Sequence, residues 1–337
     1  MENKEANVVF FQRKARNVGN YSVEFIFNDI RNRLQDKITF STLYSKYEST
    51  GLFKRLYNCV EALLNQGSVN HVTGDINYLG LLLNKKKTIH TILDCVFIAS
   101  SSGFKRSVLK YFWLAVPVKR SKFITAISTA TKNEILKYVS CNPDKIIVIP
   151  VAISDRFIQR PKTFNKAKPV ILQIGTAHNK NIPRLIEALK GISCTLQIVG
   201  KQNHAYENLL KEHTIEYTYQ WGLSDEDMIS KYAEADIITL VSTYEGFGMP
   251  ILEAQATGRP VITSNILSMP EVAGDAAYLA DPFDVLSIRE GFIKIISDDD
   301  YRDQLLKNGI ENIKRFNPEK IALQYLSLYQ KIASRQQ

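Results

Sequence analysis

Residues 237–258 read IITLVSTYEGFGMPILEAQATG, and this order of residue types predicts a buried strand, a turn and a helix. The apolar run Ile237–Val241 is typical of parallel sheets that helices cover on both faces. Pro250 is expected at the first helical position, where its missing N–H costs nothing, and Gly258 is expected at the helix end. Ligands of such sheets bind beyond the carboxyl ends of the strands, so the turn is a candidate binding site.

The residues of this turn suit a phosphorylated sugar ligand. Gly246 and Gly248 let the main chain approach a ligand closely, and the free N–H groups at a helix start attract phosphate. Glu245 and Glu253 can present carboxylates to the same pocket, where each would accept hydrogen bonds from a pair of hydroxyl groups. The alternative is that a glutamate early in the helix only complements the helix dipole.

Strands and helices alternate along the rest of the chain. Expected strands lie at 7–11, 69–73, 88–93, 123–127, 145–150, 169–175, 195–199, 215–219 and 260–263, and expected helices at 21–34, 128–139, 183–189, 205–212, 225–235 and 250–256. This alternation predicts doubly wound α/β sheets with right-handed crossovers. Residues 152–168 show little periodicity and are expected to link two domains.

Composition fits a globular protein in the cytoplasm. The chain has 337 residues, of which 45% are hydrophobic and 23% charged. It has no apolar run of the roughly 20 residues that span a bilayer, and none of signal-peptide length follows its first residues. Its four cysteines lack the spacing of a zinc site or a disulfide framework, so buried reduced thiols are expected.

Positive charge is concentrated in the N-terminal half. Residues 1–165 contain 25 lysines and arginines against 12 acidic residues, whereas the remainder contains 18 against 22. This asymmetry predicts an anionic partner for the first half. The segment 105–122 mixes basic and aromatic residues, which fits either peripheral contact with an anionic membrane or an amphipathic helix with its aromatics packed inward. No nucleic-acid-binding motif accompanies the charge, so no nucleic-acid partner is expected.

Two acidic segments have a spacing that could hold a divalent cation. They are Asp225–Asp227 and Asp298–Asp300. The first follows Ser224, with the spacing of a capping box, and the second precedes an expected helix. Helix capping explains both, and no metal site is predicted.

Three motifs resemble those of a known family. They are Glu245-x7-Glu253 around GFGMPILEA, the stretch GRPV at 258–261 and the stretch PEVAGDAA at 270–277. Together they resemble the family-4 glycosyltransferases of GT-B fold. The resemblance is dense from about Pro169 to the C-terminus and thinner at 19–24, 70–75 and 148–150.

This resemblance implies an α/β protein with two Rossmann-like domains that face each other across a cleft. Residues 1–160 would form the acceptor-side domain, and residues 161–317 would bind the nucleotide sugar. A helix at 318–335 would pack back on the first domain. The implied reaction is retaining transfer of a hexosyl group from a nucleoside-diphosphate sugar to a saccharide or lipid-linked saccharide acceptor, as in bacterial-type surface polysaccharide synthesis. The family typically uses no metal or other cofactor.

The resemblance also assigns roles to residues. Glu245 would contact the donor sugar hydroxyls, Glu253 the ribose hydroxyls, and Lys180 the diphosphate, where it would neutralise the leaving group in place of a metal. Glu245 and Lys180 are therefore the catalytic candidates. The full donor-binding set is Gly175, Thr176, Lys180, Glu245, Gly246, Phe247, Gly248, Met249 and Glu253.

Two positions depart from the family pattern. An arginine commonly lies beside the lysine, but Thr176 and Asn179 stand there, which leaves Arg184 as another cation that could complete the diphosphate site. In the first domain a histidine commonly precedes an aspartate at a strand end, but Leu93 precedes Asp94. Either His71 or His90 could face the acceptor instead, although a lone histidine is more often structural. The acceptor-side candidates are Gly19, Asn20, His71 and Asp94.

Two rival functions stay open. A nucleotide-sugar epimerase or hydrolase of the same fold would need no acceptor. A binding subunit with impaired catalysis is the other, because Leu93 and Asn179 replace family residues.

Overall fold

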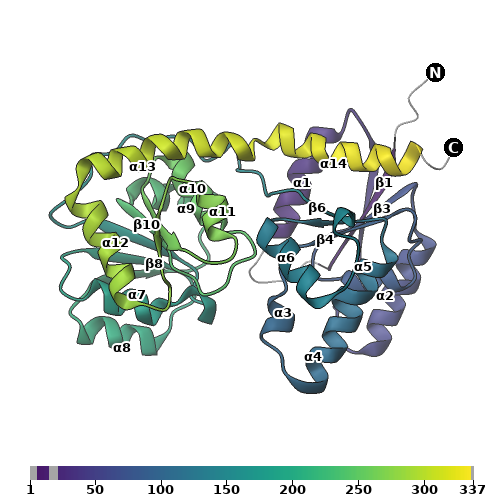
Figure 1. Ribbon diagram of the computed structural model, residues 1–337, viewed down its shortest axis with the longest axis horizontal. Helices are drawn as coiled ribbons and strands as arrows, with labels where there is room; N and C mark the ends of the chain where they lie inside the picture. Colours follow the sequence, from purple (N-terminus) through teal and green to yellow (C-terminus); the bar gives the residue numbers. More distant parts are fainter. Residues whose placement is uncertain (1–5, 15–21, 335–337) are drawn as a thin grey trace. The chain divides into compact units, whose positions relative to one another are not determined.

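The computed structural model describes residues 6–14 and 22–334. The chain forms two compact units, which are described separately (Figure 1). The first comprises Met1–Ala152 and Pro318–Gln337, and the second comprises Ile153–Asn317. In the part of the chain that the structure describes, no helix combines the length and apolar character needed to cross a bilayer.

The first unit is built on a parallel sheet of six strands. Their spatial order is β2-β1-β3-β4-β5-β6. The strands are β1 (Asn7–Gln12), β2 (Thr39–Tyr44), β3 (Val69–Val72), β4 (Thr88–Ile92), β5 (Phe123–Ala126) and β6 (Ile146–Val148). Because β2 and β3 lie on opposite sides of β1, the strand order reverses between β1 and β3.

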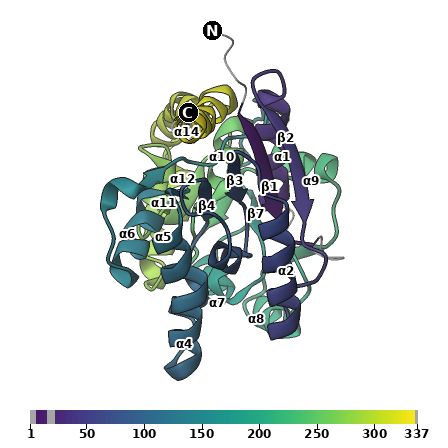
Figure 2. The ribbon, with the colours of Figure 1, turned by 90° about the vertical axis from the view of Figure 1, so that its right-hand side faces the viewer.

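Helices cover both faces of this sheet. They are α1 (Ser22–Leu34), α2 (Leu52–Leu64), η1 (Asn77–Leu81), α3 (Val96–Ala99), α4 (Gly103–Leu109), η2 (Lys110–Ala115), α5 (Val116–Arg120), α6 (Thr129–Tyr138), η3 (Pro143–Lys145) and α14 (Pro318–Ala333). The last helix, α14, lies beside α1 on one face, as Figures 1 and 2 both show. Phe10 of β1 packs edge-to-face on Tyr329 of α14, whereas the next residue, Phe11, joins the core beneath α2 and η1.

The boundary between the units lies earlier than the expected one at residue 160. The first unit ends at Ala152 because the segment that follows is bonded to the second unit. The Ile153 N–H donates to the Phe316 carbonyl oxygen at 3.1 Å. Lys162 forms an ion pair of 2.6 Å with Asp236. Most of the expected linker therefore runs along the surface of the second unit and belongs to it.

The second unit also contains a parallel sheet of six strands. They are β7 (Val170–Ile174), β8 (Thr195–Val199), β9 (Glu216–Gln220), β10 (Ile237–Leu240), β11 (Val261–Ser264) and β12 (Tyr278–Ala280). Their spatial order is β12-β11-β10-β7-β8-β9. The order reverses between β7 and β10, which is the arrangement of dinucleotide-binding Rossmann domains.

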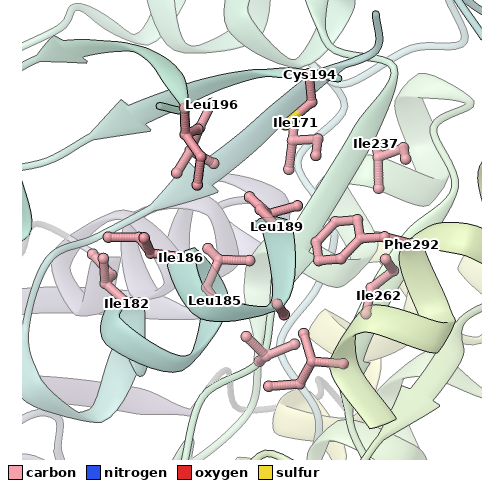
Figure 3. Packing of buried hydrophobic residues seen from close by; sticks show 14 of the residues in the cluster. Ile171, Ile182, Leu185, Ile186, Leu189, Cys194, Leu196, Ile237, Ile262 and Phe292 are labelled. Carbon is pink, nitrogen blue, oxygen red and sulfur yellow. The ribbon is translucent and has the colours of Figure 1, made fainter. Parts of the chain in front are cut away.

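The helices of this unit bury its sheet on both faces. They are η4 (His178–Lys180), α7 (Ile182–Leu189), α8 (His204–Glu212), α9 (Asp225–Glu234), α10 (Met249–Thr257), α11 (Met269–Ala273), α12 (Val285–Ser297), α13 (Asp299–Asn312) and η5 (Ile313–Phe316). Figure 3 shows how α7 and α12 fill one face: Leu189 and Phe292 point at Ile171, Ile237 and Ile262 of the central strands. This core fixes the strand ends that form the candidate site.

The acidic segments are helix caps, as expected. Ser224 and Asp227 form a complete capping box at the start of α9. Asp298 accepts a hydrogen bond from the Tyr301 N–H at the start of α13. Both segments are therefore explained by local structure.

Candidate functional site

The candidate site lies where the strand order of the second sheet reverses. The loop after β7 begins at Gly175, and the loop after β10 runs from Val241 to Gly248. The crevice beyond the carboxyl ends of two such strands is where doubly wound sheets bind ligands. The expected donor-binding residues from both loops therefore meet at one edge of the sheet.

The two catalytic candidates contact each other directly. The Lys180 Nζ lies 2.6 Å from Glu245 Oε1, and their side chains are only 17% and 16% exposed. Gly175 makes room for the lysine: a Cβ at this position would lie 2.9 Å from Lys180 Cε. Its φ of +85° is also one that side chains disfavour. The positive φ is the reason for glycine here, because the flexible Lys180 side chain can shift to make room.

Asn179 replaces the family arginine and fastens the two loops together. The Asn179 Nδ2 donates to the Tyr244 main-chain carbonyl oxygen at 2.8 Å. The main-chain carbonyl oxygen of Asn179 accepts from the Thr243 N–H, also at 2.8 Å. Asn181 continues the contact by donating to the Val241 carbonyl oxygen at 3.0 Å. The amide at 179 therefore supports the loop that carries Glu245, a role that an arginine would not fill in the same way.

The glycine-bearing turn is stabilised by hydrogen bonds from a serine hydroxyl and by the packing of a buried phenylalanine. The Ser268 hydroxyl is within 2.9 Å of the Glu245 carbonyl oxygen and 3.0 Å of the Phe247 carbonyl oxygen. The Phe247 side chain is buried and packs edge-to-face on Phe316, at 5.8 Å between ring centroids. Phe247 can therefore offer a ligand only its main chain, which is the part that the resemblance assigned to donor binding.

Helix α10 presents its N-terminus at the same place. Gly248 is its N-cap with φ +106°, and Met249 is the first helical residue, so Pro250 is the second and not the first as expected. No side chain of the described residues caps this end. The first-turn N–H groups and the helix dipole therefore favour an anion here, close to the cationic Lys180.

Glu253 is held by a tyrosine that the sequence did not single out. Its Oε2 accepts a short hydrogen bond from the Tyr232 hydroxyl, which comes from the fully buried side chain of Tyr232 on α9. Burial raises the pKa of the Glu253 carboxyl to about 7, although the Tyr232 hydrogen bond and Lys180 act in the opposite direction. Glu253, like Glu245, is half-buried.

Two further candidates have mainly supporting contacts. The Thr176 hydroxyl donates to the Lys201 carbonyl oxygen at 2.9 Å and so ties the end of β7 to the end of β8. Arg184 donates to Asn181 Oδ1 at 3.0 Å, and its guanidinium lies 5.6 Å from the Phe283 ring centre. These contacts do not test whether Arg184 completes the diphosphate site in place of an arginine at position 179, so that role stays a prediction.

His71 is part of the core of the first unit, so its prediction as an acceptor-side residue is wrong. Its side chain is fully buried between Tyr329 Oη and Thr91 Oγ1, with both hydrogen bonds at 2.8 Å. Burial lowers the pKa of His71 to about 3, so it is neutral at physiological pH. His90 is equally buried and bonds to Ser121 at 2.6 Å. Each histidine packs the fold and cannot meet a substrate.

The other acceptor-side candidates remain predictions. Gly19 and Asn20 lie outside the described residues. Asp94 is half-buried just after β4 and accepts a hydrogen bond from the Val96 N–H at 3.0 Å. This places Asp94 at the carboxyl edge of the first sheet, the edge at which ligands bind.

A charged cluster that the sequence analysis missed occupies the reversal point of the first sheet. Arg13 follows β1 and forms ion pairs with Glu24 at 2.9 Å and with Asp75, after β3, at 3.0 Å. The partners lie 11 and 62 positions away in the sequence, so no local pattern indicated the cluster. The same holds for Tyr232, whose partner Glu253 lies on another helix.

The described residues contain no group of three or more histidine, cysteine and acidic side chains that could hold a metal ion. The charged groups of the candidate site are Lys180, Glu245 and Glu253. Their arrangement offers one cation and a helix N-terminus to an anion, and two carboxylates to hydroxyl groups.

Comparisons with known proteins find similarity to glycosyltransferases. Residues 154–312 match the family model described as Glycosyl transferases group 1. Over 232 residues, which are 62% of this chain, the sequence is 31% identical to O-antigen chain mannosyltransferase B from Escherichia coli. The match spans 60% of the length of that relative.

Solved structures identify the fold. Sucrose-phosphate synthase from Thermosynechococcus elongatus superposes with a TM-score of 0.80 and 16% identity, covering 98% of this chain and all of that one. Anabaena Alr3699/HepE, solved in complex with UDP and glucose, gives 0.74 and 14%, covering 95% of this chain and 98% of that one. Two parallel six-stranded α/β sheets of this kind are the GT-B fold.

Proposed function

We propose that the protein is a retaining group 1 glycosyltransferase of family 4, which moves a hexosyl group from a nucleoside-diphosphate sugar to a saccharide or lipid-linked saccharide. The observation that carries this proposal is the Lys180–Glu245 pair of 2.6 Å at the N-terminus of α10, beside Glu253. A cation and a helix N-terminus suit a diphosphate, and the two carboxylates suit the hydroxyl groups of a sugar and a ribose.

The donor is expected to divide the site into three parts. The diphosphate takes the Lys180 ammonium and the first N–H groups of α10, and the transferred sugar takes Glu245. The ribose takes Glu253, so its hydroxyls share that carboxylate with Tyr232 or displace the tyrosine hydroxyl. The relative from Escherichia coli is a mannosyltransferase, which makes mannose the first sugar to test.

Catalysis then rests on electrostatic stabilisation of the departing nucleoside diphosphate. Negative charge develops on the diphosphate as the glycosidic bond breaks, and Lys180 with the α10 dipole is placed to stabilise it. The acceptor hydroxyl attacks from the same face as the bond to the diphosphate breaks, and its proton passes to the departing diphosphate oxygen, so no covalent nucleophile is assigned. A fixed cation at this position can perform the charge neutralisation that a divalent metal performs in other transferases.

The acceptor belongs to the first unit in this proposal. Surface polysaccharide synthesis on the cytoplasmic face of a membrane is the proposed setting, since the mannosyltransferase relative builds O-antigen chains. Asp94 and the Arg13 cluster lie at the ligand-binding edge of the first sheet. Among the described residues they are the ones that we propose contact the acceptor.

Donor turnover separates this function from its rivals. A transferase consumes nucleotide sugar only when an acceptor is supplied. A hydrolase releases free sugar without acceptor, an epimerase isomerises the donor, and an impaired binding subunit binds without turnover. UDP- and GDP-linked hexoses are incubated with and without an extracted lipid-linked acceptor. Release of nucleoside diphosphate separates the transferase and the hydrolase from the other two cases, and chromatography of the remaining donor separates the epimerase from the binding subunit.

Substitution of Glu253 tests the donor site itself. Glu253→Ala is expected to weaken nucleotide-sugar binding by about 10- to 100-fold, because hydrogen bonds to a charged group contribute about 1.5–3 kcal/mol. Isothermal titration calorimetry measures the change, and Glu290→Ala, an exposed glutamate on α12, is the matched control. A folded Glu253→Ala protein that binds the donor as tightly as the parent would refute the proposal.

A further inference from the structure

Helix α2 carries an exposed apolar stripe along its whole length. Seven large apolar side chains are between 40% and 86% exposed: Leu52, Phe53, Leu56, Tyr57, Val60, Leu63 and Leu64. At about 100° per residue, all seven fall within an arc of about 140° on the helix surface. A surface helix normally turns such a stripe toward the core. Here the stripe faces away from it.

The opposite face of α2 attaches the helix to the sheet. Asn58, Cys59 and Ala62 are its buried residues. The Asn58 amide donates to the Tyr47 carbonyl oxygen at 2.9 Å and to the Tyr78 hydroxyl at 3.1 Å. These specific hydrogen bonds fix the rotation of the helix about its axis. The exposure of the stripe is therefore a property of the fold.

A second helical segment extends the apolar surface. Helix α4 runs without interruption into η2, and Phe104, Tyr111 and Phe112 on this segment are 85%, 56% and 40% exposed. Tyr111 and Phe112 do not pack inward, whereas Trp113 and Leu114 do, so the expectation of inward packing holds for only part of the segment. The segment is tied to α2 by Arg55, whose guanidinium lies 4.6 Å from the Trp113 ring centre. Figure 2 shows α2 and α4 projecting at the same end of the first unit.

Basic residues predominate in the sequence that contains α4 and η2, and α2 itself carries Lys54, Arg55 and Glu61. Between Asp75 and Glu134 the sequence has one acidic residue, Asp94, and ten lysines and arginines. Lys54 on α2 and Lys105 on α4 are exposed beside the apolar side chains. Apolar side chains flanked by cations are the pattern of helices that lie in the interface of an anionic bilayer. A second copy of this chain would bring like charges together, which disfavours self-association through the same face.

We propose that α2 together with α4–η2 forms a docking surface for an anionic lipid bilayer. The stripe of α2 and the exposed aromatics of α4–η2 enter the headgroup region, and the surrounding lysines and arginines contact lipid phosphates. This binding does not depend on the proposed transferase activity, because it uses no residue of the donor site. It would keep the enzyme at a membrane that contains lipid-linked substrates.

Flotation with vesicles tests the docking surface. The full chain is incubated with vesicles of phosphatidylcholine alone or of phosphatidylcholine and phosphatidylglycerol in equal parts. We expect binding to the anionic vesicles that weakens as salt rises, and little binding to the neutral ones. The double substitution Phe53→Asp/Leu64→Asp is expected to lower partitioning roughly tenfold or more, because it replaces two inserted apolar side chains by anions.

A matched double variant isolates the surface from a general effect of charge. Leu286→Asp/Ile293→Asp places the same changes on exposed positions of α12, at 66% and 47% exposure, and is expected to float like the parent. Equal partitioning of the two double variants would overturn the proposal, as would absence of vesicle binding by the parent. A concentration-dependent dimer that Phe53→Asp/Leu64→Asp dissociates would also overturn it in favour of a second copy of the chain. Circular dichroism establishes that each variant is folded.

Discussion

The two sheets reverse their strand order at equivalent points, but the charges at these points differ. Arg13 and Asp75 join the loops after β1 and β3 in the first unit, and Lys180 and Glu245 join the loops after β7 and β10 in the second. Arg13 also pairs directly with Glu24, whereas in the part of the chain that the structure describes Glu253 is not a direct partner of Lys180. Lys180 has one carboxylate partner and lies near a helix N-terminus.

The two reversal points therefore suit different ligands, although both sheets have the same architecture. A lysine whose single partner can be released is suited to a diphosphate whose charge grows during reaction. An arginine that is ion-paired with two carboxylates has less charge to offer an anion than a lysine with one such partner. Under the proposed function we therefore expect the donor at the second unit and a polyhydroxyl acceptor at the first, which the following substitutions examine.

The largest effect is expected from Lys180→Ala. Loss of the cation should lower kcat by about 10²- to 10³-fold, the usual magnitude for removing one group that stabilises transition-state charge. Initial rates with saturating donor measure it. Lys190→Ala, an exposed lysine at the end of α7, should leave kcat unchanged. A kcat within threefold of the parent, at roughly the precision of such assays, would remove Lys180 from the mechanism.

The next effect concerns pH and Glu253. Its carboxyl has a pKa of about 7 in the ligand-free fold, above its ordinary value of 4.5. Donor hydroxyls require the ionised form, so donor affinity should rise as pH increases through 7. In the free protein the sign is opposite: the raised pKa favours folding when the group is protonated, so its contribution to the free energy of unfolding falls between pH 4.5 and 7.

Tyr232→Phe tests the origin of this pH dependence. The tyrosine hydrogen bond lowers the pKa of Glu253, so its removal should move the midpoint of donor binding to higher pH. Titration calorimetry from pH 5.5 to 8.5 measures the midpoint. A loss of affinity that is equal at every pH would indicate that Tyr232 only supports packing.

The smallest effect is expected from Arg13→Gln. The substitution leaves Glu24 and Asp75 without their shared cation and should lower the free energy of unfolding by about 1–3 kcal/mol. Acceptor KM should rise several-fold while donor KM stays the same. An equal rise in donor KM would break the division of roles between the two reversal points.

The sequence predicts regular elements where a strong local pattern exists. The strand and helix around Glu245 and Glu253 follow from an apolar run, two glycines and a proline, and the structure confirms them within one or two residues. Strand β2 was missed because it lies at the sheet edge with mostly exposed side chains, so it lacks an apolar run. Helix α2 was missed although its apolar residues recur at helical spacing from Leu52 to Leu64.

Contacts between distant residues could not be predicted in the same way. The role of Asn179 depends on the backbone of Tyr244, 65 positions away. The burial of His71 depends on Tyr329, 258 positions away. A single sequence does not show which residues far apart in the chain lie close together in space. His71 was therefore predicted as a site residue, although α14 buries it.

The place of α14 in the chain bears on how the protein is made. Tyr325 and Tyr329 complete the core around His71, yet the ribosome adds them after the entire second unit. During synthesis the first unit lacks α14, so one sheet face is only partly covered, while the second unit can already fold. Chains that stop before residue 318 should therefore expose that face and be the ones that chaperones and proteases capture.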